Sequence, residues 1–304
     1  MLLTSASLWL PLGAVGALLG LRHLLHRGLA PEATVAGSHP TDHGLMAQAV
    51  RIPGARGLNL FAWFVPAPGP GLHPAIVLLH GWGGNASTLL PAAQALHRAG
   101  YAVLLLESRN HGRSDRDDYS SLPRFAEDLD SALDWLSSQK DVNAGCLMAL
   151  GHSVGGAAVL LSASRRHDLR AVVSVSAFAH PEQVMRRWLM ARHVPYWPLG
   201  WLVNRYVEWV ISARFDDIAP INTLAHANCQ VLLLHGKQDV MVPVADAREL
   251  WQSRGKASVL LIECNGTHAG FDNLDQVTRS ILAFLAPTIH TEASQKLFPT
   301  PENP

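Results

Sequence analysis

The sequence predicts an α/β fold in which eight strands form a mostly parallel sheet with helices on both faces and a helical lid insertion. Short, continuous apolar runs, which are typical of strands buried on both faces, alternate along the chain with segments of helical spacing. One of these runs leads directly into a turn with glycine on both sides of a serine, and a helix of small residues follows. This alternation favours repeated strand–helix units, which place consecutive strands parallel.

The first residues predict a hydrophobic anchor. Residues 1–21 are mostly apolar and carry no charged side chain, and Arg22 and Arg27 follow them closely. This length suffices for a membrane-spanning helix, so we expect a single-pass N-terminal anchor over residues 1–27 and membrane association. The basic residues on its C-terminal side place the following domain in the cytoplasm by the positive-inside rule. A cleaved signal and a peripheral segment are the alternatives, although nothing basic precedes the apolar run.

The main domain is expected over residues 47–286, after a linker at 28–46 that lacks periodicity. Its first two strands flank a Pro-Gly turn and indicate a β-hairpin. Strands are expected over residues 47–52, 58–65, 75–79, 102–106, 146–150, 170–175, 230–234 and 258–262, and helices over 88–99 and 122–139. The polar, Pro-containing residues 287–304 predict a disordered tail.

Residues 179–225 interrupt the alternation of strands and helices. Four of the nine tryptophans fall here, and arginines are interleaved with them. We expect a helical lid over the carboxyl edge of the sheet, with Trp197 and Trp201 as candidate substrate-binding residues. The alternative is that most of these aromatic side chains only pack the insertion against the core.

The composition excludes several functional classes. Twenty-four basic residues balance 24 acidic ones without a basic stripe, so we expect no nucleic-acid partner. Cys146, Cys229 and Cys264 are far apart and lack the spacing of metal ligands, which favours buried thiols. The sequence therefore predicts no metal site.

The segment Gly151-His152-Ser153-Val154-Gly155 has the pattern of a nucleophile elbow, a sharp turn between a strand and a helix. Such a turn strains the backbone at the serine, and side chains at positions 151 and 155 would collide with neighbouring backbone. Ser153 would then expose its hydroxyl at the amino end of a helix, where backbone N–H groups lie close by. The pattern predicts Ser153 as a nucleophile.

A serine hydroxyl needs a base to remove its proton, and the base needs an acid to orient it. Asp239 follows one apolar strand and His268 follows the last one, and catalytic groups of parallel sheets gather at this edge. We therefore predict His268 as the base and Asp239 as the acid. Asp246, Glu263 and Asp272 compete with Asp239 for that role, whereas structural hydrogen bonding is expected for the other strand-end histidines, which are His80, His111, His152 and His235.

The chain resembles the α/β-hydrolase fold superfamily over residues 47–285. It is most similar to the serine-hydrolase branch that contains membrane-tethered esterases and prolyl-oligopeptidase-like catalytic domains. The resemblance lies in five stretches, each at a strand end and in the same order along the chain: residues 80–84 (HGWGG), 109–114 (RNHGRS), 151–155 (GHSVG), 235–239 (HGKQD) and 266–268 (GTH). The order Ser153, Asp239, His268 is also that of the superfamily.

The resemblance implies an oxyanion hole made by the backbone N–H groups of Trp82 and Val154. It also implies a serine hydrolase that cleaves an ester through an acyl-enzyme intermediate and uses no cofactor. The expected partner is a small-molecule ester, with a lipophilic ester as one option. A thioesterase, an acyltransferase, a peptidase or a haloperoxidase with the same triad, or a ligand receptor with low turnover, remain alternatives.

Overall fold

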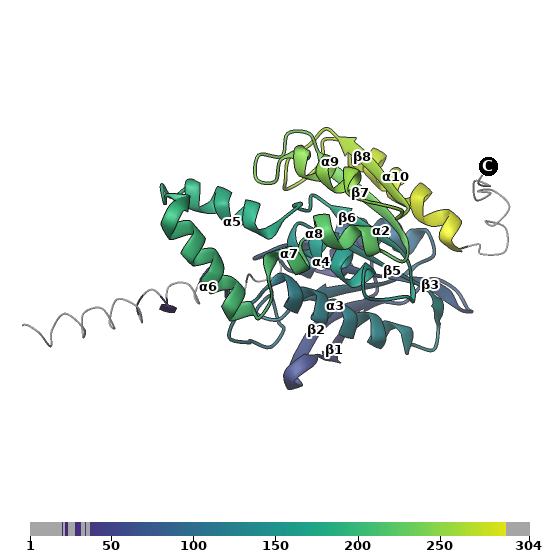
Figure 1. Cartoon of the computed structure of the whole chain (residues 1–304). Coiled ribbons are helices and arrows are strands. Elements are labelled where there is room, and N and C mark those ends of the chain that lie inside the picture. Colours follow the sequence, from purple (N-terminus) through teal and green to yellow (C-terminus); the bar gives the residue numbers. More distant parts are fainter. Residues whose placement is uncertain (1–19, 21, 24–27, 32–33, 35–36, 290–304) are drawn as a thin grey trace, which may run out of the picture.

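The computed structural model describes residues 37–289, together with residues 20, 22–23, 28–31 and 34 (Figure 1). An eight-stranded sheet crosses the molecule in the order β1-β2-β4-β3-β5-β6-β7-β8. β2 pairs antiparallel with both β1 and β4, and the other neighbouring pairs are parallel. The bounds are β1 Gln48–Pro53, β2 Asn59–Val65, β3 His73–Leu79, β4 Ala102–Glu107, β5 Val142–His152, β6 Leu169–Val175, β7 Gln230–Gly236 and β8 Val259–Cys264. The prediction of an eight-stranded, mostly parallel sheet is confirmed.

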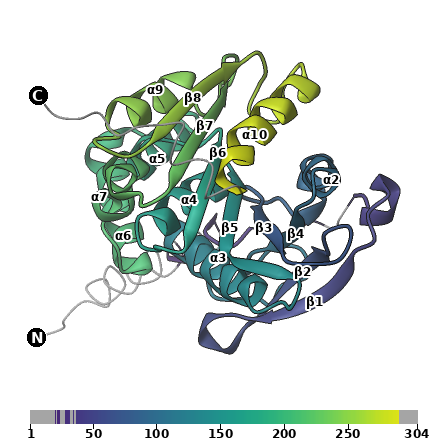
Figure 2. The same cartoon turned by 90° about the vertical axis from the view of Figure 1, so that its right-hand side faces the viewer.

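Helices cover both faces of this sheet, so its central strands are buried on both sides. Successive side chains of a strand point to opposite faces. In β3, Ile76 and Leu78 therefore belong to one core, whereas Val77 and Leu79 belong to the other. α2 and α10 lie on the first face and α3, α4 and α9 on the second (Figure 2). Their bounds are α2 Leu90–Arg98, α3 Leu122–Ser137, α4 Val154–Ala163, α9 Val244–Gln252 and α10 Leu274–Ile289.

Most predicted boundaries are shifted by two residues or fewer, and two differ by more. β5 begins at Val142, earlier than the apolar run at 146–150, because exposed residues at 143–145 extend the strand before it enters the core. α10 continues to Ile289 and carries Pro287 in its last turn, so the predicted tail at 287–304 starts inside a helix. Residues 290–304, the rest of that predicted tail, lie outside the described residues.

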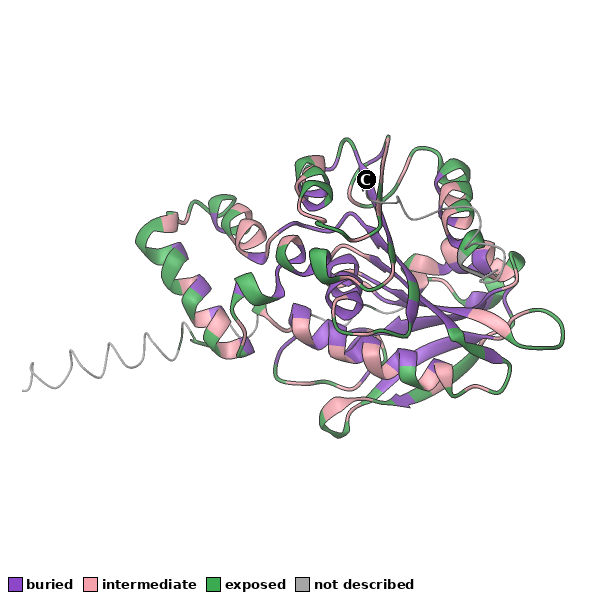
Figure 3. Cartoon of the chain, turned by 45° about the vertical axis from the view of Figure 1, so that its right-hand side comes forward, coloured by how far each residue is buried: buried purple, intermediate pink, exposed green. Residues whose placement is uncertain are grey.

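The segment between β6 and β7 is helical and contains α5 Pro181–Met190, a π-helical turn at Tyr196–Gly200, α6 Trp201–Ile211, α7 Phe215–Ile218 and α8 Pro220–Thr223. α5 and α6 form a projection that extends beyond the sheet (Figure 1), and much of its surface is exposed (Figure 3). Val207 and Ile211 on the inner side of α6 join the core. The insertion is therefore present, and its action as a lid stays a prediction.

The predicted N-terminal membrane anchor is corrected. In the part of the chain that the structure describes, no helix combines the length and the apolar character that crossing a membrane requires. Most of the predicted anchor, residues 1–19, lies outside the described residues. The single-pass membrane location, the membrane association and the cytoplasmic placement derived from the anchor are corrected with it.

Candidate active site

Ser153 occupies a strained turn between β5 and α4. Its φ of 56° and ψ of −118° place a residue that has a Cβ atom in the left-handed half of the conformational map. A Cβ atom at Gly151 would lie 2.1 Å from the carbonyl oxygen of Gly155, and one at Gly155 would lie 2.5 Å from that of His80. Both glycines are therefore required by close backbone approach, as the elbow pattern predicts.

The structure brings Ser153, His268 and Asp239 together, although they lie far apart in the sequence. His268 Nε2 lies 3.0 Å from Ser153 Oγ, and His268 Nδ1 lies 2.7 Å from Asp239 Oδ2. Because a carboxylate only accepts hydrogen bonds, Nδ1 carries the proton of the neutral imidazole. Nε2 then has a free lone pair that accepts a hydrogen bond from the Ser153 hydroxyl. This arrangement is able to move a proton away from Ser153.

Asp239 is buried, and its loop holds the carboxylate in one orientation. Oδ1 accepts hydrogen bonds from the backbone N–H groups of Met241 at 2.9 Å and Val242 at 2.8 Å. These bonds leave Oδ2 directed at His268. The other acidic candidates have different partners: Arg187 lies 2.5 Å from Asp246, and Arg248 lies 2.6 Å from Glu263. Asp272 makes its described hydrogen bond through its backbone N–H to Asn265.

Gln238 joins the loops that carry Asp239 and His268. Its side-chain oxygen accepts a hydrogen bond from the Gly266 N–H at 2.5 Å, and the backbone N–H of Gln238 donates to the Gly266 carbonyl at 2.9 Å. No sequence pattern marks Gln238 as a functional residue. Its position directly before Asp239 was the available signal, but a polar residue in a loop indicates no particular partner.

His152 contacts His268 from the elbow itself. Its Nε2–H donates to the backbone carbonyl of His268 at 2.8 Å, and the two ring centroids lie 5.0 Å apart. Burial lowers the pKa of His152, and the hydrogen bond to the His268 carbonyl only partly opposes this shift, so the neutral imidazole is favoured. A neutral ring there adds no positive charge beside His268.

The two predicted oxyanion donors lie in segments next to Ser153. Val154 follows Ser153 and begins α4. The loop that contains Trp82 also reaches Ser153, since a Cβ atom at Gly81 would lie 3.1 Å from the Cβ atom of Ser153. The Trp82 indole stacks on Phe125 with ring centroids 6.3 Å apart and is 42% exposed. The role of the two N–H groups as oxyanion donors stays a prediction.

Trp197 and Trp201 lie beside each other in the insertion, with ring centroids 5.6 Å apart. They are 72% and 39% exposed, so neither is a core residue. Trp197 lies in the π-helical turn, and Trp201 is the first residue of α6. The junction of α5 and α6 lies at the outer end of the projection (Figure 1). Contact of the two tryptophans with substrate stays a prediction.

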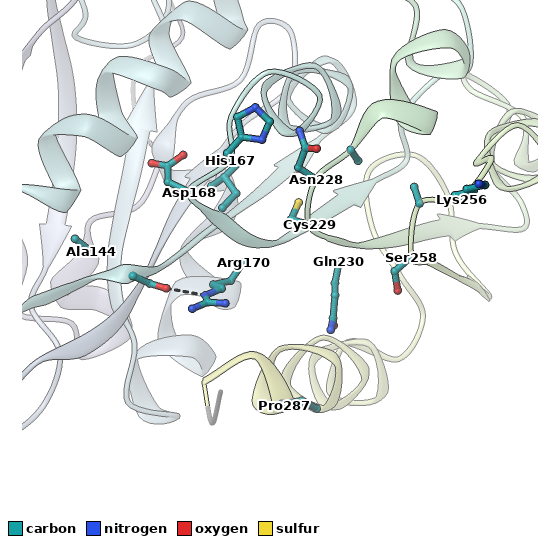
Figure 4. Close-up of a pocket in the computed structure, with 14 residues that line it drawn as sticks. Ala144, His167, Asp168, Arg170, Asn228, Cys229, Gln230, Lys256, Ser258 and Pro287 are labelled. Atoms are coloured by element: carbon teal, nitrogen blue, oxygen red, sulfur yellow. Dashed lines mark hydrogen bonds between the residues drawn. The ribbon is translucent and has the colours of Figure 1, made fainter. Parts of the chain in front are cut away.

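A cavity of about 730 Å³ lies at the opposite edge of the sheet (Figure 4). It is lined by residues at the starts of β5, β6, β7 and β8 and by Pro287 of α10. Arg170 beside it donates a hydrogen bond to the Gly145 carbonyl at 2.8 Å. None of its lining residues belongs to the Ser153 site. Among the described residues, no cluster of His, Cys, Asp and Glu has an arrangement that would hold a metal ion.

Comparison with known proteins gives one family match and several relatives. A family model described as serine aminopeptidase, S33, matches residues 72–220, which include the loop at 80–84 and Ser153. An uncharacterized protein of Mycobacterium tuberculosis is 29% identical over 194 residues, 64% of this chain and 62% of that protein. The chain thus spans about 62% of the length of this relative.

Two solved structures have a similar backbone. An esterase of Pyrococcus furiosus superposes with a TM-score of 0.71 at 18% identity, over 86% of this chain and 97% of the esterase. A puromycin-hydrolyzing peptidase of Mycobacterium tuberculosis superposes with a TM-score of 0.64 at 20% identity, over 82% of this chain and 40% of the peptidase. At these identities the similarity shows a common fold.

Proposed function

Since the chain belongs to the serine hydrolases of the α/β-hydrolase superfamily, we propose that it cleaves carboxylic esters with Ser153, His268 and Asp239 as its catalytic triad. The observation that carries this proposal is the continuous hydrogen-bonded path from Ser153 Oγ through His268 to Asp239, with distances of 3.0 Å and 2.7 Å. Nucleophile, base and orienting acid are thereby within reach of one another before substrate binds.

In the first half of the reaction, His268 Nε2 takes the hydroxyl proton while Ser153 Oγ attacks the ester carbonyl. The carbonyl electrons move to its oxygen, and the N–H groups of Trp82 and Val154 donate to this oxyanion. Asp239 stabilises the imidazolium of His268. Collapse of the tetrahedral intermediate breaks the bond to the alcohol oxygen, which takes the proton from His268 and leaves as the alcohol.

In the second half, water hydrolyses the acyl-enzyme. His268 takes one proton from the water molecule as its oxygen attacks the acyl carbonyl, and the same two N–H groups receive the oxyanion. The bond to Ser153 Oγ breaks, and the proton returns from His268 to this oxygen. The acid is released with the enzyme regenerated, and no cofactor takes part in this sequence.

A peptidase is the second candidate, because the matching family model is described as a serine aminopeptidase. The ester proposal is supported by the esterase of Pyrococcus furiosus. The superposition includes 97% of that esterase, whereas it includes only 40% of the peptidase. The same triad serves both reactions, so the substrates must be compared directly.

The test combines a covalent label with two substrate series. A fluorophosphonate should label the wild-type protein and not Ser153→Ala, since it reacts with an activated serine. Purified protein should then hydrolyse p-nitrophenyl esters, tested from acetyl to palmitoyl, and should not cleave aminoacyl coumarin amides. Release of the coumarin that is lost in Ser153→Ala would favour the peptidase. Labelling with one slow turnover, and a large rise in melting temperature on ligand binding, would favour a receptor.

A further inference from the structure

Two buried histidines connect the loops that follow β3 and β4. His80 comes directly after β3 and His111 lies in the loop after β4, and these strands are parallel neighbours in the sheet. The side chains are 0% and 1% exposed, and their ring centroids lie 4.8 Å apart. Both rings also pack against Phe125 of α3. The pair is therefore buried between the two loops and α3.

The hydrogen bonds of the pair are reciprocal. His80 Nε2 accepts from the Ser108 N–H in the β4 loop at 3.2 Å, and His111 Nε2 accepts from the Gly83 N–H in the β3 loop at 3.1 Å. Each Nδ1 lies close to a backbone carbonyl: Gly81 for His80, at 2.7 Å, and Arg109 for His111, at 2.9 Å. A carbonyl only accepts, so each Nδ1 carries the proton and each Nε2 offers a lone pair.

This bonding scheme requires both imidazoles to be neutral, and their surroundings keep them so. Burial, reinforced for His80 by the neighbouring His111, lowers the pKa of His80 to about 3. Burial lowers the pKa of His111 to about 4, with a smaller contribution from Arg116. At neutral pH each ring therefore has one donor and one acceptor. The acceptor links the two loops, and the donor bonds to a carbonyl of the loop that carries the ring.

The two linked positions flank Trp82. The Gly81 carbonyl receives the His80 Nδ1–H and also the Gly84 N–H at 3.0 Å. This carbonyl and the Trp82 N–H belong to the same planar peptide unit, in which C=O and N–H point in opposite directions. Holding the carbonyl therefore fixes the direction of the Trp82 N–H, and the bond from Gly83 to His111 holds the next peptide unit. Gly83 has a φ of 71°, which glycine adopts without steric strain, so the turn is not strained at this residue.

We propose that His111 is a positioning residue, which holds the loop at 80–84 so that the Trp82 N–H points at the oxyanion formed on substrate attack. The inference rests on the proposed function, because it assigns a purpose to that N–H group. His111 touches neither substrate nor Ser153 in this account. It acts through Gly83, and its effect should be largest when negative charge develops on the substrate oxygen.

The test uses variants of His111 with two different capacities for hydrogen bonding. His111→Phe keeps a ring of similar shape and removes both bonds, whereas His111→Gln keeps an acceptor and a donor. We expect His111→Phe to lower kcat by about 10- to 100-fold with little change in KM, since loss of one oxyanion donor costs about 100- to 1,000-fold. His111→Gln should recover part of this loss. Affinity for a trifluoromethyl ketone, which forms a tetrahedral oxyanion on the serine, should fall by the same factor as kcat/KM.

Leu133→Ala serves as the matched control, because Leu133 is fully buried on α3 and lies outside this hydrogen-bonded set. It should lower the melting temperature while kcat of the folded protein is retained. A His111→Phe protein with wild-type kcat and ketone affinity would overturn the inference. It would also be overturned if the losses of kcat among the variants simply paralleled their decreases in melting temperature. If His111→Phe does not fold, the same comparison is made between His111→Gln and wild type. A wild-type protein that neither reacts with a fluorophosphonate nor hydrolyses esters would instead contradict the proposed function, and this inference with it.

Discussion

His152 donates a hydrogen bond from Nε2 to the backbone carbonyl of His268, at 2.8 Å. The residue just before the proposed nucleophile thus holds the backbone of the proposed base. The loop of Asp239 also supports the loop of His268, through the hydrogen bonds between Gln238 and Gly266. Two other segments of the chain therefore hold the loop that carries the proposed base.

The bond between His152 and His268 predicts a moderate effect on turnover. His152→Ala should lower kcat by about 5-fold, because a typical hydrogen bond contributes about 1 kcal/mol and each 1.36 kcal/mol of barrier is a tenfold change in rate. His152→Gln, which keeps an N–H donor of similar reach, should recover most of this loss. Steady-state kinetics of both variants on one ester decide the matter. Equal rates for the alanine and glutamine variants would show that the hydrogen bond is not what matters.

The geometry of Asp239 predicts a large effect on kcat with little effect on binding. Asp239→Asn should reduce kcat by several orders of magnitude, since an amide is a poor partner for the Nδ1–H of His268 and does not stabilise its imidazolium. Substrate affinity should be nearly unchanged. Asp246→Asn is the control, because Asp246 is paired with Arg187 on the insertion. A greater loss of kcat in Asp246→Asn than in Asp239→Asn would assign the acid differently.

The fold and the site differ in how far they were predictable from sequence. The sheet was predictable because its strands are buried on both faces and leave continuous apolar runs, as in β3. Ser153, Asp239 and His268 could be proposed as one site because each follows a strand end, and Gly151 and Gly155 mark a turn that has no room for side chains.

The partners of the buried histidines were not predictable. His80 and His111 bond to backbone groups 28 residues away, and those contacts depend on the register between β3 and β4 rather than on a local pattern. The direction in which α5 and α6 project was also not predictable, although the insertion itself was predicted. Aromatic residues such as Trp197 suggested burial over a pocket, but this side chain is 72% exposed. Composition alone does not distinguish a residue that lines a pocket from one that lies on the surface.

The insertion gives a prediction about substrate preference. If Trp197 and Trp201 contribute to an acyl pocket, replacing either with alanine should reduce turnover of medium-chain esters much more than turnover of acetyl esters. The p-nitrophenyl series measured on Trp197→Ala and Trp201→Ala, with the melting temperature of each variant, provides the comparison. The same fractional loss of turnover on short and long esters would show that neither residue contributes to an acyl pocket.

The buried histidines predict a loss of stability in mild acid. The pKa values of His80 and His111 are lowered to about 3 and about 4, whereas an unfolded histidine titrates near 6.5. Between these values the unfolded chain binds protons that the native protein does not bind, so the free energy of unfolding falls as the pH falls through 6.5. Above pH 6.5 their contribution to stability is fully present.

The measurement is urea unfolding at pH 7.5 and at pH 5.5 for the wild type and for His80→Gln. The variant should be less stable at pH 7.5, because glutamine does not reproduce the bonds of His80. Its loss on acidification should nevertheless be smaller than that of the wild type by about 1.4 kcal/mol, the contribution of one histidine over one pH unit below 6.5. Identical losses for the two proteins would mean that His80 is not a buried neutral group.

Mass spectrometry of the fluorophosphonate-treated protein tests the central claim most directly, because it identifies the residue that reacts. The wild-type protein should gain one adduct, which digestion locates on the peptide containing Ser153, and ester hydrolysis should stop in proportion to labelling. Ser153→Ala should remain unlabelled and retain almost no hydrolysis, and combining it with His268→Ala should cause little further loss, since the triad acts as a unit. An adduct on another residue, or normal ester hydrolysis by Ser153→Ala, would contradict the assignment of Ser153 as the nucleophile.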